Sequence, residues 1–329
     1  MILVCGGAGY IGSHMVRRLL DLGKTPIILD NLSTGHRSSI PKGVTFYEGD
    51  VRDTDLLRKV FHENPVEGVI HFCANSLVGE SMTDPLKYYD NNVGGAISLL
   101  RAMSEASVPH VIFSSTAATY GEPEEVPILE TAPTNPTNTY GETKLAMEKM
   151  FRWVDQAGGP KFVALRYFNV AGAYPGGVIG EDHHPETHLI PLLLEVPRGK
   201  RQEATIFGTD YPTPDGTCIR DYIHVMDIVE GHILALAYLQ RTGISNLFNL
   251  GTGTGFSVSE ILEATRSATG HPIPAVVKER RAGDPAILVA DNHKAREVLG
   301  WEPSHSTIDQ ILESAWTWHR THPDGYGDR

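Results

Sequence analysis

The stretch Ile2-Leu3-Val4-Cys5-Gly6-Gly7-Ala8-Gly9-Tyr10-Ile11-Gly12 decides the fold. It joins a short apolar run to glycines at positions 6, 9 and 12, and a helical pattern then continues through Leu22. Glycine lets the backbone approach a ligand closely, and a helix N-terminus offers free N–H groups and a positive dipole end. The order of strand, glycine turn and helix predicts a pyrophosphate site. A tight turn without a ligand is the alternative.

The second strand favours the same reading. Thr25-Pro26-Ile27-Ile28-Leu29-Asp30 is an apolar run that ends in a carboxylate, 18 residues after Gly12. A dinucleotide fingerprint places its ribose-binding acid about there. The alternative is an ordinary aspartate at the end of a strand. A carboxylate would repel a 2′-phosphate, which favours NAD over NADP, although His36 and Arg37 nearby leave NADP open.

Strands and helices alternate through the N-terminal half of the chain. We expect strands at 44–48, 69–72, 111–114 and 162–167, and helices at 54–62, 84–106 and 140–157. This alternation predicts an α/β fold with a Rossmann-type doubly wound parallel sheet. After Asn169 the alternation breaks, and it returns with a helix from Met226 to Leu239 and a strand at 248–250. We therefore expect an NAD-binding domain of residues 1–168 with 225–251, and a smaller α/β domain of residues 169–224 with 252–329.

Tyr140-Gly141-Glu142-Thr143-Lys144 is the candidate catalytic segment. Pro136 and Asn138 are helix-start signals, and strong helix formers follow. On a helix, the phenol and the ammonium four residues apart share a face. A phenol titrates near ~10, and a neighbouring cation lowers that pKa. The pair could therefore remove a proton from an alcohol. Tyr-x-x-x-Lys is also common by chance, so a simple surface pair is the alternative.

Polar residues lie where ligands of such sheets bind, beyond the carboxyl ends of the strands. Asp50 could meet an adenine amino group or cap the next helix. Asn91-Asn92 lies inside an expected helix, where either a buried hydrogen-bonding role or a polar face would explain it. Thr116 belongs to the hydroxyl-rich run from Ser114 to Gly121 and could share a proton with a substrate alcohol; turn chemistry is the alternative.

Composition excludes several classes of partner. The chain has 329 residues, 41% hydrophobic, with a formal net charge of −12, which argues against nucleic acids and anionic membranes. Cys5, Cys73 and Cys218 are far apart and form no Cys-x-x-Cys, which suits a reducing cytoplasm rather than a disulfide framework. No secretory leader and no membrane-spanning apolar run is expected.

The run Glu181-Asp182-His183-His184-Pro185-Glu186-Thr187-His188 resembles a metal cluster. His184 and His188 are four apart, as on one face of a helix. Pro185, however, disfavours helix for the residue before it. We therefore expect no metal here, and assign the run to a polar loop on the substrate side.

Taken together, these motifs resemble the extended short-chain dehydrogenase/reductase superfamily. Longer blocks resemble its UDP-galactose (UDP-glucose) 4-epimerase family over nearly the whole chain. These blocks are His71-Phe72, 78–81, 88–93, 166–169, 210–213, 215–217, 220–225 and 249–251.

The resemblance implies a mechanism. Tyr140 would take the proton of the sugar 4-hydroxyl, Lys144 would lower the pKa of Tyr140 and hold the nicotinamide ribose, and Thr116 would hydrogen-bond the 4-oxygen. A hydride would pass from C4 to a tightly held NAD⁺ and return to the other face of a rotated 4-ketose. The nucleotide must then be gripped firmly and the sugar loosely.

The resemblance also implies the binding residues and a homodimer paired through helices 84–106 and 140–157. For NAD these are Gly6, Gly9, Tyr10, Ile11, Gly12, Asp30, Asn31, Asp50, Val51, Phe72, Ala74, Asn91, Ser114, Tyr140, Lys144 and Tyr167. For the UDP-hexose they are Thr116, Tyr140, Phe168, Asn169, His188, Leu189, Thr205, Phe207, Arg220, Arg281, Asp284 and Leu288. Arg220 and Arg281 could clamp diphosphate oxygens, and Phe207 could stack on uracil. Surface arginines and a core phenylalanine are the alternatives.

Three positions depart from the family pattern. Ser76 stands where some members carry a Lys near the cofactor phosphate, so NAD retention could be weaker. His188 stands where others have Asn, so its contact could vary with pH. Leu288 stands where side-chain size is thought to decide whether an N-acetylated sugar fits, and Leu is intermediate in size.

Three rival functions share these motifs. A nucleotide-sugar 4,6-dehydratase would need acids directly after Thr116, where this chain has Ala117 and Ala118. An ordinary dehydrogenase that releases NADH remains open as a side activity. A non-catalytic NAD sensor would typically lack Tyr140 or Lys144, and both are present.

Overall fold

The computed structural model describes residues 1–281 and 284–328, and it confirms the α/β fold with a doubly wound parallel sheet. Seven strands form the sheet in the order β11-β6-β5-β4-β1-β2-β3, with every neighbouring pair parallel. The strands are β1 (Ile2–Cys5), β2 (Pro26–Asp30), β3 (Thr45–Glu48), β4 (Gly68–His71), β5 (His110–Thr116), β6 (Lys161–Tyr167) and β11 (Asn246–Leu250). The order reverses between β1 and β4, the place where such sheets bind ligands.

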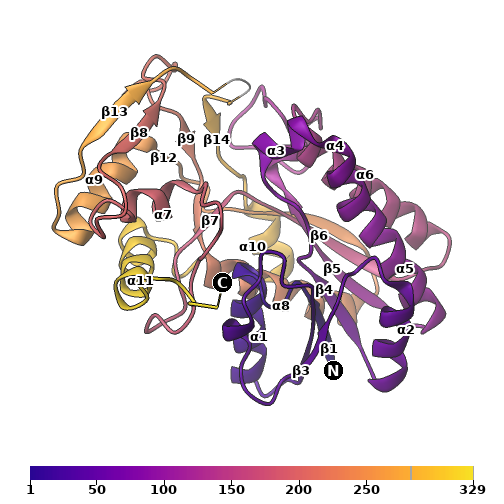
Figure 1. Ribbon diagram of the computed structural model, residues 1–329. Helices are drawn as coiled ribbons and strands as arrows, with labels where there is room; N and C mark the ends of the chain where they lie inside the picture. The colour runs from indigo at the N-terminus through magenta and orange to yellow at the C-terminus, as the bar shows by residue number, and fades with distance from the viewer. Residues whose placement is uncertain (282–283, 329) are drawn as a thin grey trace.

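Helices cover both faces of this sheet (Figure 1). On one face lie α1 (Tyr10–Asp21), α8 (Val225–Thr242) and α10 (His293–Leu299). On the other lie α2 (Thr54–Glu63), α5 (Gly95–Glu105) and α6 (Thr139–Gln156). Successive strand residues point to opposite faces, so Leu3 joins one hydrophobic cluster and Val4 joins the other.

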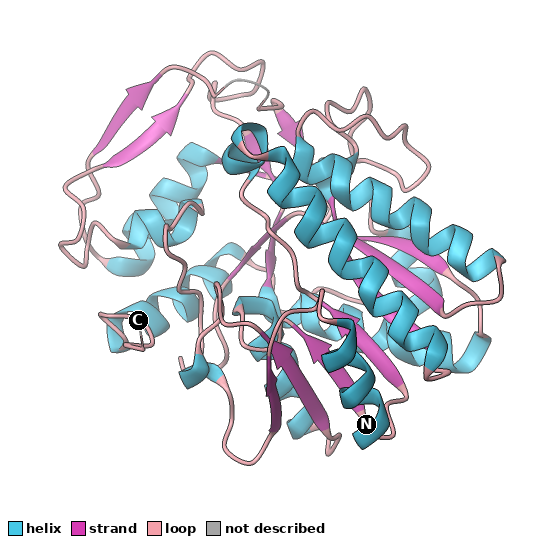
Figure 2. Ribbon diagram, turned by 45° about the vertical axis from the view of Figure 1, so that its right-hand side comes forward, coloured by secondary structure: helices cyan, strands magenta, loops and turns pink. Residues whose placement is uncertain are grey.

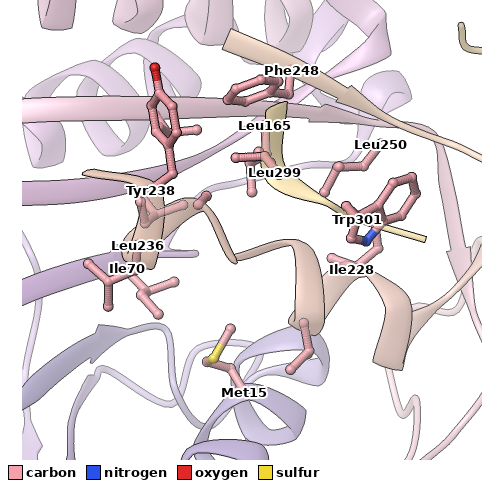
Figure 3. Packing of buried hydrophobic residues seen from close by; sticks show 14 of the residues in the cluster. Met15, Ile70, Leu165, Ile228, Leu236, Tyr238, Phe248, Leu250, Leu299 and Trp301 are labelled. Atoms are coloured by element: carbon pink, nitrogen blue, oxygen red, sulfur yellow. The ribbon is translucent and has the colours of Figure 1, made fainter. Parts of the chain in front are cut away.

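Figure 3 shows part of the cluster on the α1 and α8 face, where Met15, Ile70 and Ile228 pack together with Trp301. Trp301 is fully buried, and its indole N–H donates to the carbonyl of Asp227 over 2.8 Å. Residues 293–301, which we expected in the smaller domain, therefore pack on the large sheet.

A second group of elements has its own hydrophobic cluster, which includes Ile190, Leu193, Ile261 and Leu312. Its strands are β7 (Asn169–Ala171), β8 (Ala204–Phe207), β9 (Ile219–Arg220), β10 (Tyr222–His224), β12 (Phe256–Ser257), β13 (Ala275–Lys278) and β14 (Ile287–Leu288). Its helices are α7 (Leu189–Leu194), α9 (Val258–Thr269) and α11 (Ile308–Thr321). The ribbon of β8 and β13 lies at the edge remote from the large sheet (Figures 1 and 2).

The expected helix at 84–106 is confirmed as a continuous helical run that Asp84 caps. It consists of α4 (Pro85–Tyr88), a π-helical segment η2 (Tyr89–Gly94) that the sequence did not reveal, and α5, and the short helix α3 (Val78–Thr83) precedes it. Short 3-10 turns, η1 (Arg37–Ser39) and η3 (Ala117–Thr119), complete the described elements. None of the helices within the described residues is long and apolar enough to cross a membrane.

Candidate active site

A cleft lies at the carboxyl ends of the central strands. Gly6 follows β1, Asp30 ends β2, Phe72 follows β4, and Ser114 and Tyr167 lie near the ends of β5 and β6; all five line the cleft. Parallel strands end at one edge of their sheet, which brings together residues that are far apart in the sequence.

The glycine turn forms one wall of the cleft. Gly6 has a φ of +81°, a left-handed conformation that favours glycine. At Gly12, an added Cβ would lie 1.9 Å from the carbonyl oxygen of Gly6, so no side chain fits there. The turn can therefore pass directly beneath the first turn of α1, whose free N–H groups attract anions.

Asp30 is a buried carboxylate at this wall. Its oxygens accept from the backbone N–H groups of Ala8 over 2.9 Å and Leu32 over 2.8 Å. Burial raises the pKa of Asp30, and these backbone hydrogen bonds oppose the rise. The carboxylate therefore fixes the glycine turn as well as facing the cleft.

The contacts of Asp50 and Arg37 bear on two points that the sequence left open: the role of Asp50, and the choice between NAD and NADP. Asp50 does not cap α2, because Asp53 does so by accepting from the N–H of Leu56. The carboxylate of Asp50 instead binds Arg52 and lines the cleft, and Arg52 lowers its pKa to about 2. Arg37, which could have met a 2′-phosphate, is paired with Glu48.

Tyr140, Lys144 and Thr116 all line the cleft. Asn138 begins α6 by accepting from the N–H of Gly141 over 2.9 Å, as expected, and this places Tyr140 and Lys144 on one face. The ammonium of Lys144 donates to the carbonyl of Ser114 over 2.8 Å and lies 5.8 Å from the ring centre of Tyr140. The helix and the end of β5 thus hold three proton-handling groups together.

The expected lowering of the pKa of Tyr140 by Lys144 is not seen in the structure. Burial raises the pKa of Tyr140, and a hydrogen bond with Thr116 opposes the rise. Burial also lowers the pKa of Lys144 to about 7, and the nearby charge of Glu148 opposes this shift. This lowered pKa weakens the pull of the ammonium on the phenol.

A buried ion pair lies one helical turn beyond Lys144. Glu148 and Arg166 have side chains only 3% and 4% exposed, and their closest contact is 2.6 Å. Glu148 also accepts from the hydroxyl of Ser115, and the guanidinium of Arg166 lies 4.6 Å from the ring centre of Tyr120. This network fixes α6 to β5 and β6 behind the three catalytic candidates.

Asn92 explains the π-helical segment. Its buried side chain accepts from the N–H of Asn75 over 2.8 Å and donates to the hydroxyl of Thr143 over 3.0 Å. Asn91, beside it, donates to Asn92 and lines the cleft. The buried hydrogen-bonding role is therefore correct for Asn92, and π-helical turns are frequent at functional sites.

The structure brings every residue predicted to contact NAD to the lining of this one cleft. Four of the predicted substrate residues beyond the catalytic ones also line it, namely Phe168, Asn169, His188 and Leu189. The Nδ1 atom of His188 lies 2.5 Å from the carboxylate of Glu181, which raises the pKa of His188 against the effect of burial.

The six other predicted substrate residues do not line the cleft. Arg220 forms an ion pair with Asp284, and the guanidinium of Arg281 lies 4.2 Å from the ring centre of Phe207. Thr205 lies on β8. Leu288 pairs in register with Arg220 and packs, like Phe168, against the cluster around Ala117.

Sequence reasoning missed part of the lining, including Ser33, Thr34, Cys73, Glu181, His183, Ile190 and Tyr222. Glu181 and His183 had a signal, the Glu-Asp-His-His run, but it was assigned to the loop as a whole. Tyr222 and Ile190 read as ordinary core residues, because nothing local shows which of their edges faces a ligand.

Known proteins resemble this chain over its full length. The profile of the NAD dependent epimerase/dehydratase family matches residues 2–251. A UDP-glucose 4-epimerase of Lacticaseibacillus casei is 57% identical over 328 residues, 100% of this chain and 99% of that protein. The structure of UDP-glucose 4-epimerase from Brucella ovis in complex with NAD is 47% identical, with a TM-score of 0.93 and 96% and 97% of the two chains covered. That from Bifidobacterium longum in complex with NAD+ and UDP is 42% identical, with a TM-score of 0.93 and 98% and 99% covered.

Proposed function

Because the chain belongs to the NAD dependent epimerase/dehydratase family, we propose that it interconverts UDP-galactose and UDP-glucose with NAD as cofactor, a reaction of galactose metabolism. It is an isomerase that acts on carbohydrates. One observation carries the proposal: Tyr140, Lys144 and Thr116 share a single cleft with the glycine turn and Asp30.

The residues of the cleft fit NAD. The turn at Gly6 and Gly12 has no room for side chains, so the start of α1 can approach a pyrophosphate. Asp30 faces the cleft where a ribose would lie, and its carboxylate would repel a 2′-phosphate, which favours NAD over NADP. When bound, NAD⁺ supplies a reversible hydride acceptor for C4 of the sugar.

The protein residues move the proton of the sugar 4-hydroxyl. Tyr140 takes this proton as general base and gives it back when the hydroxyl re-forms. Thr116 hydrogen-bonds Tyr140 and can hold the same sugar oxygen. Lys144, fixed by the carbonyl of Ser114, places a positive charge beside the phenol whenever it is protonated.

The nucleotide is held by residues beyond this centre. Asn169, His188 and Leu189 contact it from the wall of the cleft, and Arg220 and Arg281 clamp the diphosphate once they are drawn from Asp284 and Phe207. Because the contacts with UDP are firm and those with the sugar are few, the hexose can rotate and present its other face to the cofactor.

A dehydratase reaction lacks its proton donors. Removal of water across C5 and C6 requires an acid and a base in the site. The resemblance implies that dehydratases carry them directly after the residue equivalent to Thr116. Ala117 and Ala118 occupy these positions in η3, and neither can transfer a proton. The cleft therefore favours epimerisation.

Incubation of the purified protein with UDP-galactose and no added cofactor tests the proposal. We expect UDP-glucose as product. A 4-keto-6-deoxy sugar would identify a dehydratase, and unchanged substrate with retained NAD would identify a sensor. Tyr140→Phe should lower turnover at least ~100-fold while NAD binding and the melting temperature stay nearly unchanged; undiminished turnover would reject Tyr140 as the base.

Two domains are part of the proposal. Residues 1–168 with 225–251 form the NAD-binding domain, and residues 169–224 with 252–329 form the nucleotide-sugar domain. The separate hydrophobic cluster around Ile190 and Leu312 supports the division. The segment 293–301 is an extension of the second domain that covers the large sheet.

We also propose a homodimer paired through residues 84–106 and 140–157. Leu86, Tyr89 and Trp153 are exposed apolar side chains on these segments, and Met82 lies beside them. Light scattering should give the mass of a dimer for the unmodified chain and of a monomer for Leu86→Glu.

The three free cysteines further support a reducing, cytoplasmic compartment.

A further inference from the structure

Four metal-binding side chains meet at the edge of the cleft. Glu181, His183, Glu186 and His188 come from the loop between β7 and α7, and one ligand atom from each lies within 4.8 Å of all the others. The sequence had suggested His184 and His188 as the pair. The structure replaces His184 with His183, because the side chain of His184 is 67% exposed and lies beside Asp182, 3.7 Å away.

The distances are close to those of a tetrahedral site. With bonds of about 2.1 Å, the ligand atoms of such a zinc site lie roughly 3.4 Å apart. The Nδ1 atom of His183 lies 3.3 Å from Oε1 of Glu181 and 3.8 Å from Oε2 of Glu186, and the Nδ1 atom of His188 lies 3.9 Å from Oε1 of Glu186. The 2.5 Å hydrogen bond between His188 and Glu181 must open to admit an ion.

Burial and charge favour a cation at this position. The side chains of Glu181 and Glu186 are only 4% and 10% exposed, and buried carboxylates are costly unless a positive charge compensates them. Glu181, His183 and His188 line the same cleft as the glycine turn, and the ring of Tyr10 at the start of α1 lies 6.1 Å from that of His183. In the structure the imidazoles of His183 and His188 pair with these carboxylates, and a bound ion would take over that compensation.

We propose that Glu181, His183, Glu186 and His188 form a binding site for one divalent transition-metal ion, best matched by Zn²⁺. Two imidazoles and two carboxylates are ligands that zinc accepts, and zinc tolerates their tetrahedral arrangement. The ion would cancel the charge of the two carboxylates and fix residues 181–188 against the cleft. Binding through Nδ1 leaves the Nε2–H of His188 free to donate to a nucleotide.

A hydrogen-bonded cluster without metal is the alternative to the proposed site, because His183 and His188 already pair with Glu181. The metal content is therefore the decisive measurement, since such a cluster would contain no metal.

The test uses protein purified without a polyhistidine tag, stripped with EDTA and then equilibrated with Zn²⁺. We expect about one bound zinc per chain by elemental analysis, and a higher melting temperature with zinc than without it. His183→Gln should weaken zinc binding by more than about tenfold and abolish the thermal shift. His184→Gln, a change of the same kind on the exposed neighbour, should behave like the unmodified chain.

Two results would overturn the metal site. One is an unmodified chain that takes up no zinc above the level of a buffer control. The other is an equal loss of zinc in His183→Gln and His184→Gln, which would indicate a surface histidine rather than the cluster. The melting temperature of His183→Gln without zinc shows whether this variant folds. Epimerisation by protein that takes up no zinc would reject the metal site and leave the proposed function intact.

Discussion

Glu148→Gln tests the network behind the catalytic residues. The change keeps the shape of the side chain but leaves the guanidinium of Arg166 buried without its counter-charge. Breaking a buried pair in this way costs about 3–5 kcal/mol. With an unfolding entropy of about 2.1 cal/mol/K per residue, a loss of ~4 kcal/mol lowers the melting temperature of a chain of this length by roughly 6 °C.

The same change should act on catalysis through Lys144. The charge of Glu148 opposes the lowering of the pKa of Lys144, which lies near 7. Its removal should therefore lower the pKa of Lys144 further, so that less of the ammonium is protonated at neutral pH. The alkaline limb of the pH–rate profile, where Lys144 loses its proton, should then move to lower pH.

Thermal denaturation and the pH dependence of UDP-galactose turnover measure both effects. Glu105→Gln is the matched control, since it removes the partner of Arg58 from an ion pair about half exposed on both sides. Exposed pairs contribute little to stability, so this control should melt close to the unmodified chain. A Glu148→Gln variant that melts no lower than the control, with an unmoved pH profile, would refute the reasoning.

Three further predictions follow from the cleft and the core. Gly12→Ala should lower the melting temperature and the NAD affinity, because its Cβ would lie 1.9 Å from the carbonyl oxygen of Gly6, a strain of about 1–3 kcal/mol. In the control Gly9→Ala, the Cβ would lie 3.4 Å from the same oxygen, so this variant should fold normally. Equal melting temperatures of the two variants would argue against a steric cause. Asp30→Asn should weaken NAD binding roughly ten- to a hundredfold by calorimetry, as expected for loss of a charged hydrogen bond, and unchanged affinity would remove Asp30 from the ribose site. Acid should destabilise the fold, because histidines that are buried and neutral in the folded protein take up protons in the unfolded chain. Their contribution to the free energy of unfolding is complete above pH 6.5 and falls toward pH 3–4, by up to ~1.4 kcal/mol per pH unit for each histidine. Denaturant unfolding from pH 7 to pH 4.5 measures this loss, and a constant free energy of unfolding would contradict it. The histidines with the lowered pKa values are His14 and His71, at about 3, and His224, His232 and His319, at about 4.

Local patterns were sufficient for the fold, the glycine turn and Asp30, whereas most other residues of the NAD side were implied by the family resemblance. The apolar run, the glycines and Asp30 each carry their structural reason within a few residues, and parallel strands bring their ends together automatically. Once the alternation of strands and helices was recognised, Ser114 and Tyr167 had to face the same cleft as Gly6.

Contacts between distant segments could not be predicted in this way. The π-helical segment depends on hydrogen bonds from Asn92 to Asn75 and Thr143, and no local spacing reveals them. The pKa of Tyr140 depends on burial, which the Tyr-x-x-x-Lys spacing does not contain.

The substrate side of the cleft was the least predictable, because it also depends on contacts between distant segments. Helical spacing favoured His184 as the partner of His188, but the 181–188 loop is not helical and turns His183 inward instead. The pairing of Arg220 with Asp284 joins β9 to a loop 64 residues later, and only the folded chain shows it.

The fate of the hydrogen on C4 tests the central claim most directly. UDP-galactose carrying deuterium at C4 is converted in ordinary water without added cofactor, and the product is analysed by NMR. A base that moves only the hydroxyl proton, beside a hydride held within the cleft, predicts UDP-glucose that keeps its deuterium at C4. Protium from the solvent at C4 would contradict it.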